Sequence, residues 1–180
     1  MKKTTIIATI ITAFAASAFT LIATLWKADE KASTVAWELP GTDKKGTFTN
    51  LATTLNFDKS NLGESKITAS IDVKTLKAGN EKLEGHLLTA DFFDAEKFPK
   101  IIFTSTEIKA DGANYIAKGT LKMKDSTKVI DVPFSFTESD KTKGVFSGTM
   151  TVGAADYGVM KAEKAGKDKV VIYLTVPVTK

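Results

Sequence analysis

Few side chains in this sequence could carry out acid–base or metal chemistry. His86 is the only histidine, and Asp91 and Asp94 flank Phe92 and Phe93 shortly after it. An imidazole can serve as a general base, and two carboxylates can divide the acid and base roles between them. A single histidine cannot form a histidine-rich metal site, however, and aspartates commonly cap turns. We therefore interpret His86 as a surface or capping residue and predict neither a catalytic nor a metal site.

The composition excludes further classes of chemistry. The chain of 180 residues contains no cysteine, which excludes disulfides, thiolate metal sites and cysteine nucleophiles. All 25 basic residues are lysines, and arginine is the side chain that binds phosphates and guanine in a bidentate manner. Phosphate-binding loops, dinucleotide-binding glycine motifs and the Gly-x-Ser-x-Gly elbow of hydrolases are absent as well. We expect a protein that is not an enzyme and does not bind nucleic acid.

The most distinctive stretch is an aromatic run, Gly85–Phe103. It contains Phe92, Phe93, Phe98 and Phe103, and it is interrupted by acids and a proline. These interruptions argue against one continuous strand or helix over the run. We interpret it as a connector that carries large apolar groups onto a β scaffold.

That scaffold is indicated by apolar and polar residues that alternate at period two, the pattern of half-buried strands. Eight segments show it: Val35–Leu39, Gly46–Asp58, Ile67–Val73, Lys100–Lys109, Tyr115–Met123, Ile130–Phe136, Phe146–Val152 and Val170–Val178. Most turns between them are short, which favours antiparallel neighbours. Phe48 is out of phase with Leu51 and Leu55, which predicts a bulge or bend near Asn50.

One segment has helical rather than strand spacing. Asn80–Thr89 carries leucines on one helical face behind a capping asparagine, and it predicts a short helix between the third and fourth strands. Eight alternating strands can close into an up-and-down barrel, and a two-sheet sandwich is the competing architecture. We predict a mainly all-β fold, an eight-stranded antiparallel barrel with one short helix.

The apolar phases of the strands and the connector define a candidate interior. Its large side chains are Phe92, Phe93, Phe98, Phe103, Tyr115, Leu121, Phe134, Phe136, Phe146 and Met150. An eight-stranded barrel can be filled by side chains or can leave room for one small ligand. Periodicity does not distinguish these two cases, and both stay open at this point.

The N-terminal segment differs from the rest of the chain. The sequence begins Met-Lys-Lys, and Thr4–Trp26 then carries no charge, as in a secretory signal peptide. A helix over those 23 residues would be about 34 Å long and could span the roughly 30 Å core of a bilayer, so an uncleaved anchor is the alternative. We assign residues 1–26 to a signal peptide or N-terminal membrane anchor, 27–33 to a linker and 34–180 to the barrel domain. Either way the domain is expected outside the cytoplasmic membrane, secreted to the periplasm or anchored in the inner membrane.

Several motifs occur in a consistent order along the domain. They are Trp37, Gly46-Thr47-Phe48, Ile71-Asp72-Val73, His86-Leu87-Leu88, Asp91-Phe92-Phe93-Asp94-Ala95-Glu96-Lys97-Phe98-Pro99, Phe103-Thr104-Ser105-Thr106, Gly119-Thr120-Leu121 and Val132-Pro133-Phe134. Over Ser33–Lys180 the chain resembles the YceI-like family of bacterial secreted proteins. The resemblance implies a lipocalin-like barrel whose interior binds a long apolar chain, a polyisoprenoid or similar lipid, in the periplasm.

Two places depart from that family's pattern. Gly41–Lys45 has no histidine where members often carry one, and Asp125-Ser126-Thr127-Lys128 stands where they often have a Gly-Val-Thr-Lys-Pro-like turn. The resemblance therefore extends to the apolar lining rather than to a head-group contact at these positions.

Together the residues and the resemblance predict a non-catalytic barrel that binds a long apolar lipid, polyisoprenoid or quinone-like, as a carrier, store or sequestering protein. No cofactor other than such a lipid is expected, and a homodimer is left open. The alternative is a membrane-tethered structural or interaction module whose barrel is filled by side chains.

Overall fold

The computed structural model describes residues 25–161 and 168–180. Its helical elements are α1 (Glu81–Leu87) and three 3₁₀ turns, η1 (Leu62–Glu64), η2 (Val73–Thr75) and η3 (Ala154–Tyr157). Its strands are β1 (Leu25–Ala28), β2 (Thr34–Glu38), β3 (Lys45–Phe48), β4 (Ala52–Asn56), β5 (Lys66–Asp72), β6 (Lys100–Asp111), β7 (Asn114–Met123), β8 (Ser126–Asp140), β9 (Lys143–Gly153) and β10 (Lys169–Thr179).

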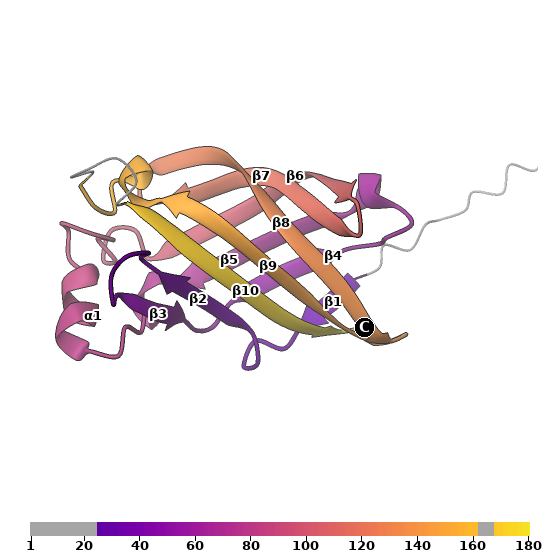
Figure 1. The fold of residues 1–180 in the computed structure, drawn as a ribbon, viewed down its shortest axis with the longest axis horizontal. Coiled ribbons are helices and arrows are strands. Elements are labelled where there is room, and N and C mark those ends of the chain that lie inside the picture. The colour runs from indigo at the N-terminus through magenta and orange to yellow at the C-terminus, as the bar shows by residue number, and fades with distance from the viewer. Residues whose placement is uncertain (1–24, 162–167) are drawn as a thin grey trace, which may run out of the picture.

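These ten segments form one closed barrel of eight strands. The hydrogen-bonded order is β1-β4-β5-β6-β7-β8-β9-β10-β2-β3, and β1 also pairs with β10, which closes the ring. Along the same edge of β10, Thr175 lies opposite Thr34 of β2 and Val178 lies opposite Ala28 of β1. β1 and β2 are thus one interrupted strand, and β3 and β4 form the next in the same way. The predicted eight-stranded antiparallel barrel is confirmed (Figure 1).

Within the described residues, the first barrel strand starts at Leu25. Trp26 of β1 is 3% exposed, and its indole nitrogen donates a hydrogen bond to the Phe57 carbonyl at 3.0 Å. The barrel domain was predicted to start at residue 34, but β1 already belongs to it. Residues 27–33, which were predicted to be a linker, lie within the interrupted first strand. The rest of the predicted signal peptide or anchor lies in residues 1–24, outside the described residues. Within the described ranges, no helix is long and apolar enough to span a membrane.

A polar turn separates β1 from β2. The Asp29 carboxylate accepts hydrogen bonds from the main-chain N–H groups of Lys31 and Ala32, both at 3.1 Å. The Ser33 hydroxyl donates to the Asp29 carbonyl at 2.7 Å, and the Asp29 N–H donates to the Pro177 carbonyl on β10. Such local side-chain bonds stabilise a turn while the strand resumes beyond it. The polar composition that suggested a linker is the composition of this turn.

The second interruption lies at Asn50, between β3 and β4. Its φ of 57° is in the left-handed region, which asparagine tolerates better than most residues. The turn lets Phe48 and Leu51 both enter the core although they are three positions apart. The bend predicted from the change of phase is confirmed.

α1 lies in the long connection between β5 and β6, where a short helix was predicted. The Asn80 side chain accepts hydrogen bonds from the N–H groups of Lys82 and Leu83, which caps the helix as expected. Figure 1 shows α1 beside β3 at one end of the barrel, with η3 at the same end and the C-terminus at the other. These are called the α1 end and the C-terminal end below.

Candidate functional site

An aromatic cluster fills the C-terminal end of the barrel. At its centre is Phe57, 1% exposed, whose ring centroid lies 5.0 to 5.6 Å from those of four other rings. The cluster, called the aromatic plug, consists of Trp26, Phe57, Tyr115, Phe134, Phe136 and Phe146. Most of its pairs meet edge to face, an arrangement that the aromatic quadrupole favours. This end of the barrel is filled by its own side chains.

Charged residues lie on the outer side of the plug. Lys59 and Glu138 form an ion pair there, and the hydrogen bond to Glu138 raises the pKa of Lys59. The Lys180 ammonium lies 4.4 Å from the centroid of the Trp26 ring, a cation–π contact. These polar groups separate the aromatic rings from solvent at this end.

The α1 end of the barrel contains a cavity of about 540 Å³, within the roughly 300–1,000 Å³ typical of small-molecule sites. Every strand from β2 to β10 contributes to its wall, together with α1 and the segments after α1 and η3. Phe134 and Phe146 belong both to the plug and to this wall, so they mark the inner limit of the cavity. Aliphatic and aromatic side chains dominate the rest of the lining.

The cavity reaches the surface beside α1. Among the described residues, two ionisable side chains line it, Lys44 in the β2–β3 turn and His86 in α1, and both are exposed. The His86 ring meets the Phe92 ring edge-on at a centroid distance of 4.6 Å. The surface position predicted for His86 is confirmed, and the structure adds that it lies on the cavity rim. Lys44, Leu83, His86 and Phe92 are called the rim below.

The inner wall is apolar and suited to contact with hydrocarbon groups. It carries no carboxylate and no ammonium group in the part of the chain that the structure describes. Across residues 25–161 and 168–180, no three His, Cys, Asp or Glu side chains gather closely enough to hold a metal ion. The arrangement can exclude water from an apolar molecule and surround it.

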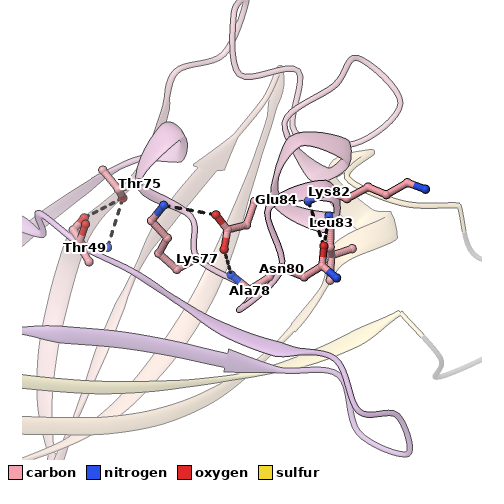
Figure 2. Close-up of polar contacts among 8 residues, drawn as sticks. All are labelled: Thr49, Thr75, Lys77, Ala78, Asn80, Lys82, Leu83 and Glu84. Carbon is pink, nitrogen blue, oxygen red and sulfur yellow. Dashed lines mark hydrogen bonds and ion pairs between the residues drawn. The ribbon is translucent and has the colours of Figure 1, made fainter.

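Polar contacts hold α1 in place at the rim (Figure 2). The Glu84 carboxylate accepts a hydrogen bond from the Ala78 N–H at 2.8 Å and lies 3.3 Å from the Lys77 ammonium. The Ala78 N–H above all, and Lys77 after it, lower the pKa of Glu84. The Thr75 hydroxyl accepts from the Thr49 N–H at 3.2 Å and lies 2.8 Å from the Thr49 carbonyl oxygen. The segment from η2 to α1 is thereby fixed to the β3–β4 strand.

The same segment approaches β3 most closely at Gly46. Next to it, Lys77 and Thr47 exchange two main-chain hydrogen bonds of 2.8 Å. A Cβ at position 46 would lie 1.9 Å from the Lys77 carbonyl oxygen and 2.8 Å from the Trp37 ring. Only glycine leaves room for this approach, which brings the Trp37 ring onto the cavity wall.

Lys124 connects two loops at the α1 end. Its ammonium donates hydrogen bonds to the main-chain carbonyls of Phe92, at 2.6 Å, and Gly158, at 2.9 Å. Phe92 lies in the segment after α1, and Gly158 directly follows η3. Both segments contribute to the cavity wall, through Phe92 and Val159 among others. One side chain therefore fixes two parts of the wall relative to each other.

Seven of the ten predicted lining residues lie on the cavity wall: Phe92, Phe93, Phe103, Leu121, Phe134, Phe146 and Met150. Tyr115 and Phe136 also face the barrel interior, but they belong to the plug. Phe98 lies away from the cavity, with the Lys97 ammonium 5.0 Å from its ring centroid. The alternative of a barrel filled by side chains describes the C-terminal end only.

Sequence reasoning missed several polar residues of the wall, among them Trp37 and Thr53. Thr53 has the phase of Leu51 and Leu55, so alternation alone places it inward, but its hydroxyl kept it off a list of apolar residues. The indole nitrogen of Trp37 and the hydroxyl oxygen of Thr53 are buried without a hydrogen-bond partner in the described structure.

Comparison with known proteins gives a consistent match. A family model described as the YceI-like domain matches residues 26–179. A UPF0312 protein of Photorhabdus laumondii is 34% identical over 85 residues, which are 47% of this chain and 44% of that relative. Protein YceI of Escherichia coli O17:K52:H18 is 32% identical with the same coverage. The chain thus spans less than half the length of these two curated relatives.

Solved structures share the fold. BcnA of Burkholderia cenocepacia has a TM-score of 0.76 at 22% identity, covering 85% of this chain and 100% of BcnA. The Campylobacter jejuni YCEI protein has a TM-score of 0.68 at 22% identity, covering 79% of this chain and 88% of its own. A domain from Saccharophagus degradans, described as a polyisoprenoid binding domain, has a TM-score of 0.62 at 12% identity, covering 86% and 97%. At these identities the likeness shows the fold alone.

Proposed function

The chain belongs to the YceI-like family, and on that premise we propose that it binds a long apolar lipid, a polyisoprenoid or quinone-like molecule, without converting it. The observation that carries the proposal is the cavity of about 540 Å³ at the α1 end, with its almost wholly apolar wall and its opening at the rim. The Saccharophagus degradans domain, which is described as polyisoprenoid-binding and has the same barrel, supports this choice of ligand class.

The energetics favour a long chain over a small apolar solute. Burial of one methylene group is worth about 0.8 kcal/mol, so a five-carbon isoprenoid unit contributes about 4 kcal/mol. Association costs about 4–15 kcal/mol in lost translational and rotational freedom. About four units offset the largest of these costs, whereas one unit offsets only the smallest.

The proposed setting is the periplasm. The sequence begins Met-Lys-Lys and continues with an uncharged apolar stretch, as export signals and inner-membrane anchors do. There the protein acts as a carrier, a store or a sequestering protein for its lipid. Cell fractionation of the full chain tests this setting, and recovery of the protein in the cytoplasm contradicts it.

Native mass spectrometry of the purified full chain tests the binding itself. A bound lipid is expected as a discrete mass increment, and solvent extraction identifies it. The delipidated protein is then titrated with a polyprenyl alcohol, and saturation at one molecule per barrel is expected. A folded, delipidated protein that shows no saturable binding contradicts the proposal.

A further inference from the structure

Three buried side-chain polar atoms in the described structure lack a hydrogen-bond partner, and two of them belong to the cavity wall. They are the hydroxyl oxygen of Thr53 and the indole nitrogen of Trp37. The third is the hydroxyl of Tyr157, which does not line the cavity. Buried polar groups in native proteins are nearly always paired, so each unpaired one calls for a specific explanation.

Thr53 is a polar residue in an apolar row. On β4 its inward neighbours in phase are Leu51 and Leu55, both buried. Valine has nearly the same shape and would fill the position without a polar atom to satisfy. Burial of a hydroxyl without a partner costs free energy. A ligand that supplies the partner is therefore favoured at this position.

Trp37 also places a buried polar atom without a hydrogen-bond partner on the cavity wall. Its ring packs against Gly46, where the missing side chain leaves room for it. An indole N–H is a donor only, so its partner must be a hydrogen-bond acceptor. Trp37 pairs with Gly46, and Thr53 lies seven residues further along the β3–β4 strand. The interruption at Asn50 separates the two groups, so they address different parts of a bound chain.

We infer that the ligand of this cavity carries hydrogen-bond-accepting oxygen atoms on its apolar body, and that Thr53 and Trp37 are specificity-determining residues for them. This inference rests on the proposed function and narrows its ligand class. A carbonyl, ether or hydroxyl oxygen on an isoprenoid satisfies these groups, whereas a pure hydrocarbon leaves them unpaired. A site built to bond a polar group discriminates strongly against an analogue that lacks it.

The test compares two ligands of similar apolar size on the delipidated full chain: squalene, a hydrocarbon, and a prenylated benzoquinone, which carries oxygen. The wild type is expected to bind the quinone at least about tenfold more tightly than squalene. Thr53→Val keeps the shape and removes the polar atom, so it is expected to weaken quinone binding about fivefold to tenfold and to leave squalene binding unchanged or tighter. Trp37→Phe removes the N–H together with part of the apolar wall, so it is expected to weaken quinone binding more than squalene binding.

Two control variants separate recognition from structural damage. Thr53→Ser keeps the hydroxyl and is expected to retain the preference for the quinone. Thr54→Val makes the same chemical change at the next, exposed position of β4 and is expected to alter neither affinity. If Trp37→Phe does not fold, the Thr53 series decides alone.

The outcomes also separate this inference from the proposed function. Equal wild-type affinity for squalene and the quinone, or unchanged quinone affinity in both Thr53→Val and Trp37→Phe, overturns the inference while lipid binding stands. The polar atoms then hold ordered water only. A wild type that binds neither molecule overturns the proposed function and the inference with it.

Discussion

The Lys124 ammonium nitrogen lies 2.6 Å from the main-chain oxygen of Phe92, across the α1 end of the barrel. With its second bond, to the Gly158 carbonyl, it fixes the segment after α1 and the segment after η3 relative to each other. Both segments lie outside the strands at this point, so we expect this contact to restrain widening of the entrance to the cavity.

Lys124→Met removes both hydrogen bonds and keeps most of the length of the side chain. Hydrogen bonds to charged groups contribute about 1.5–3 kcal/mol when buried, and these partly exposed ones are expected at about 1 kcal/mol. We expect a bound prenyl ligand to dissociate about fivefold faster, as measured by stopped-flow displacement. Lys122→Met, at an exposed position of β7, is the control. Equal release rates in the two variants would show that Lys124 does not restrain the entrance.

Phe93 and His86 are expected to differ sharply on replacement by alanine. Phe93 lines the cavity and packs edge-on against Phe48 at a centroid distance of 6.0 Å. Its removal should cost about 3 kcal/mol of unfolding free energy, at the low end for phenylalanine because the residue is half-buried, and should weaken lipid retention. His86→Ala, at an exposed rim position, should cost within about 0.5 kcal/mol. Urea unfolding and lipid retention measure both effects, and equal losses would mean that the rim histidine has been assigned wrongly.

Two glycine-to-alanine substitutions are expected to have opposite signs. At Gly46 the added Cβ would lie 1.9 Å from a main-chain oxygen, so Gly46→Ala should lower the unfolding free energy by about 3 kcal/mol or more. At Gly85 in α1 nothing lies within 4 Å of the added carbon, so Gly85→Ala should raise it by about 1 kcal/mol through helix propensity. Urea denaturation of both variants measures this, and a tolerated Gly46→Ala contradicts the close approach of β3 and Lys77.

The carboxylate of Glu84 gives stability a specific dependence on pH. Because the Ala78 N–H and Lys77 lower its pKa in the folded protein below the usual 4.5, its contribution is present above that value and is lost as the pH falls through the folded pKa. We expect the wild type to lose more unfolding free energy than Glu84→Gln between about pH 6 and about pH 3. Glu30→Gln, at an exposed turn position, serves as the control. Parallel pH profiles for wild type and Glu84→Gln would show that these contacts do not stabilise the folded state.

The alternation of apolar and polar residues predicted well which side chains face the barrel interior. It predicted poorly where along the barrel axis each of them lies. Tyr115, Phe136 and Phe103 all face inward by alternation, yet the first two belong to the plug and the third lines the cavity. Phase reports which face of a strand a residue occupies. Position along the barrel axis depends on the register between strands, which no single strand encodes. The size of the cavity likewise depends on how all the inward side chains pack together.

The first strand shows a different limit of sequence reasoning. Trp26 ends an apolar stretch, which suggested the end of a signal peptide or membrane anchor, and the polar residues around Asp29 suggested a linker. In the structure the tryptophan is a core residue and the aspartate organises a turn within a strand. Four residues of β1 are too few for alternation to be visible. Asn50 and Asn80 were predictable because their effects are local, a left-handed turn and a helix cap.

The aromatic plug limits the route by which a ligand could enter and leave the barrel. Within the described residues the C-terminal end is filled, so the proposed lipid would enter and leave the cavity at the α1 end, and the part that enters first would leave last. If the protein acts as the proposed carrier, donor and acceptor meet the α1 end one after the other. On that proposal the protein detaches from one partner before it serves the next and does not form a continuous conduit between two membranes.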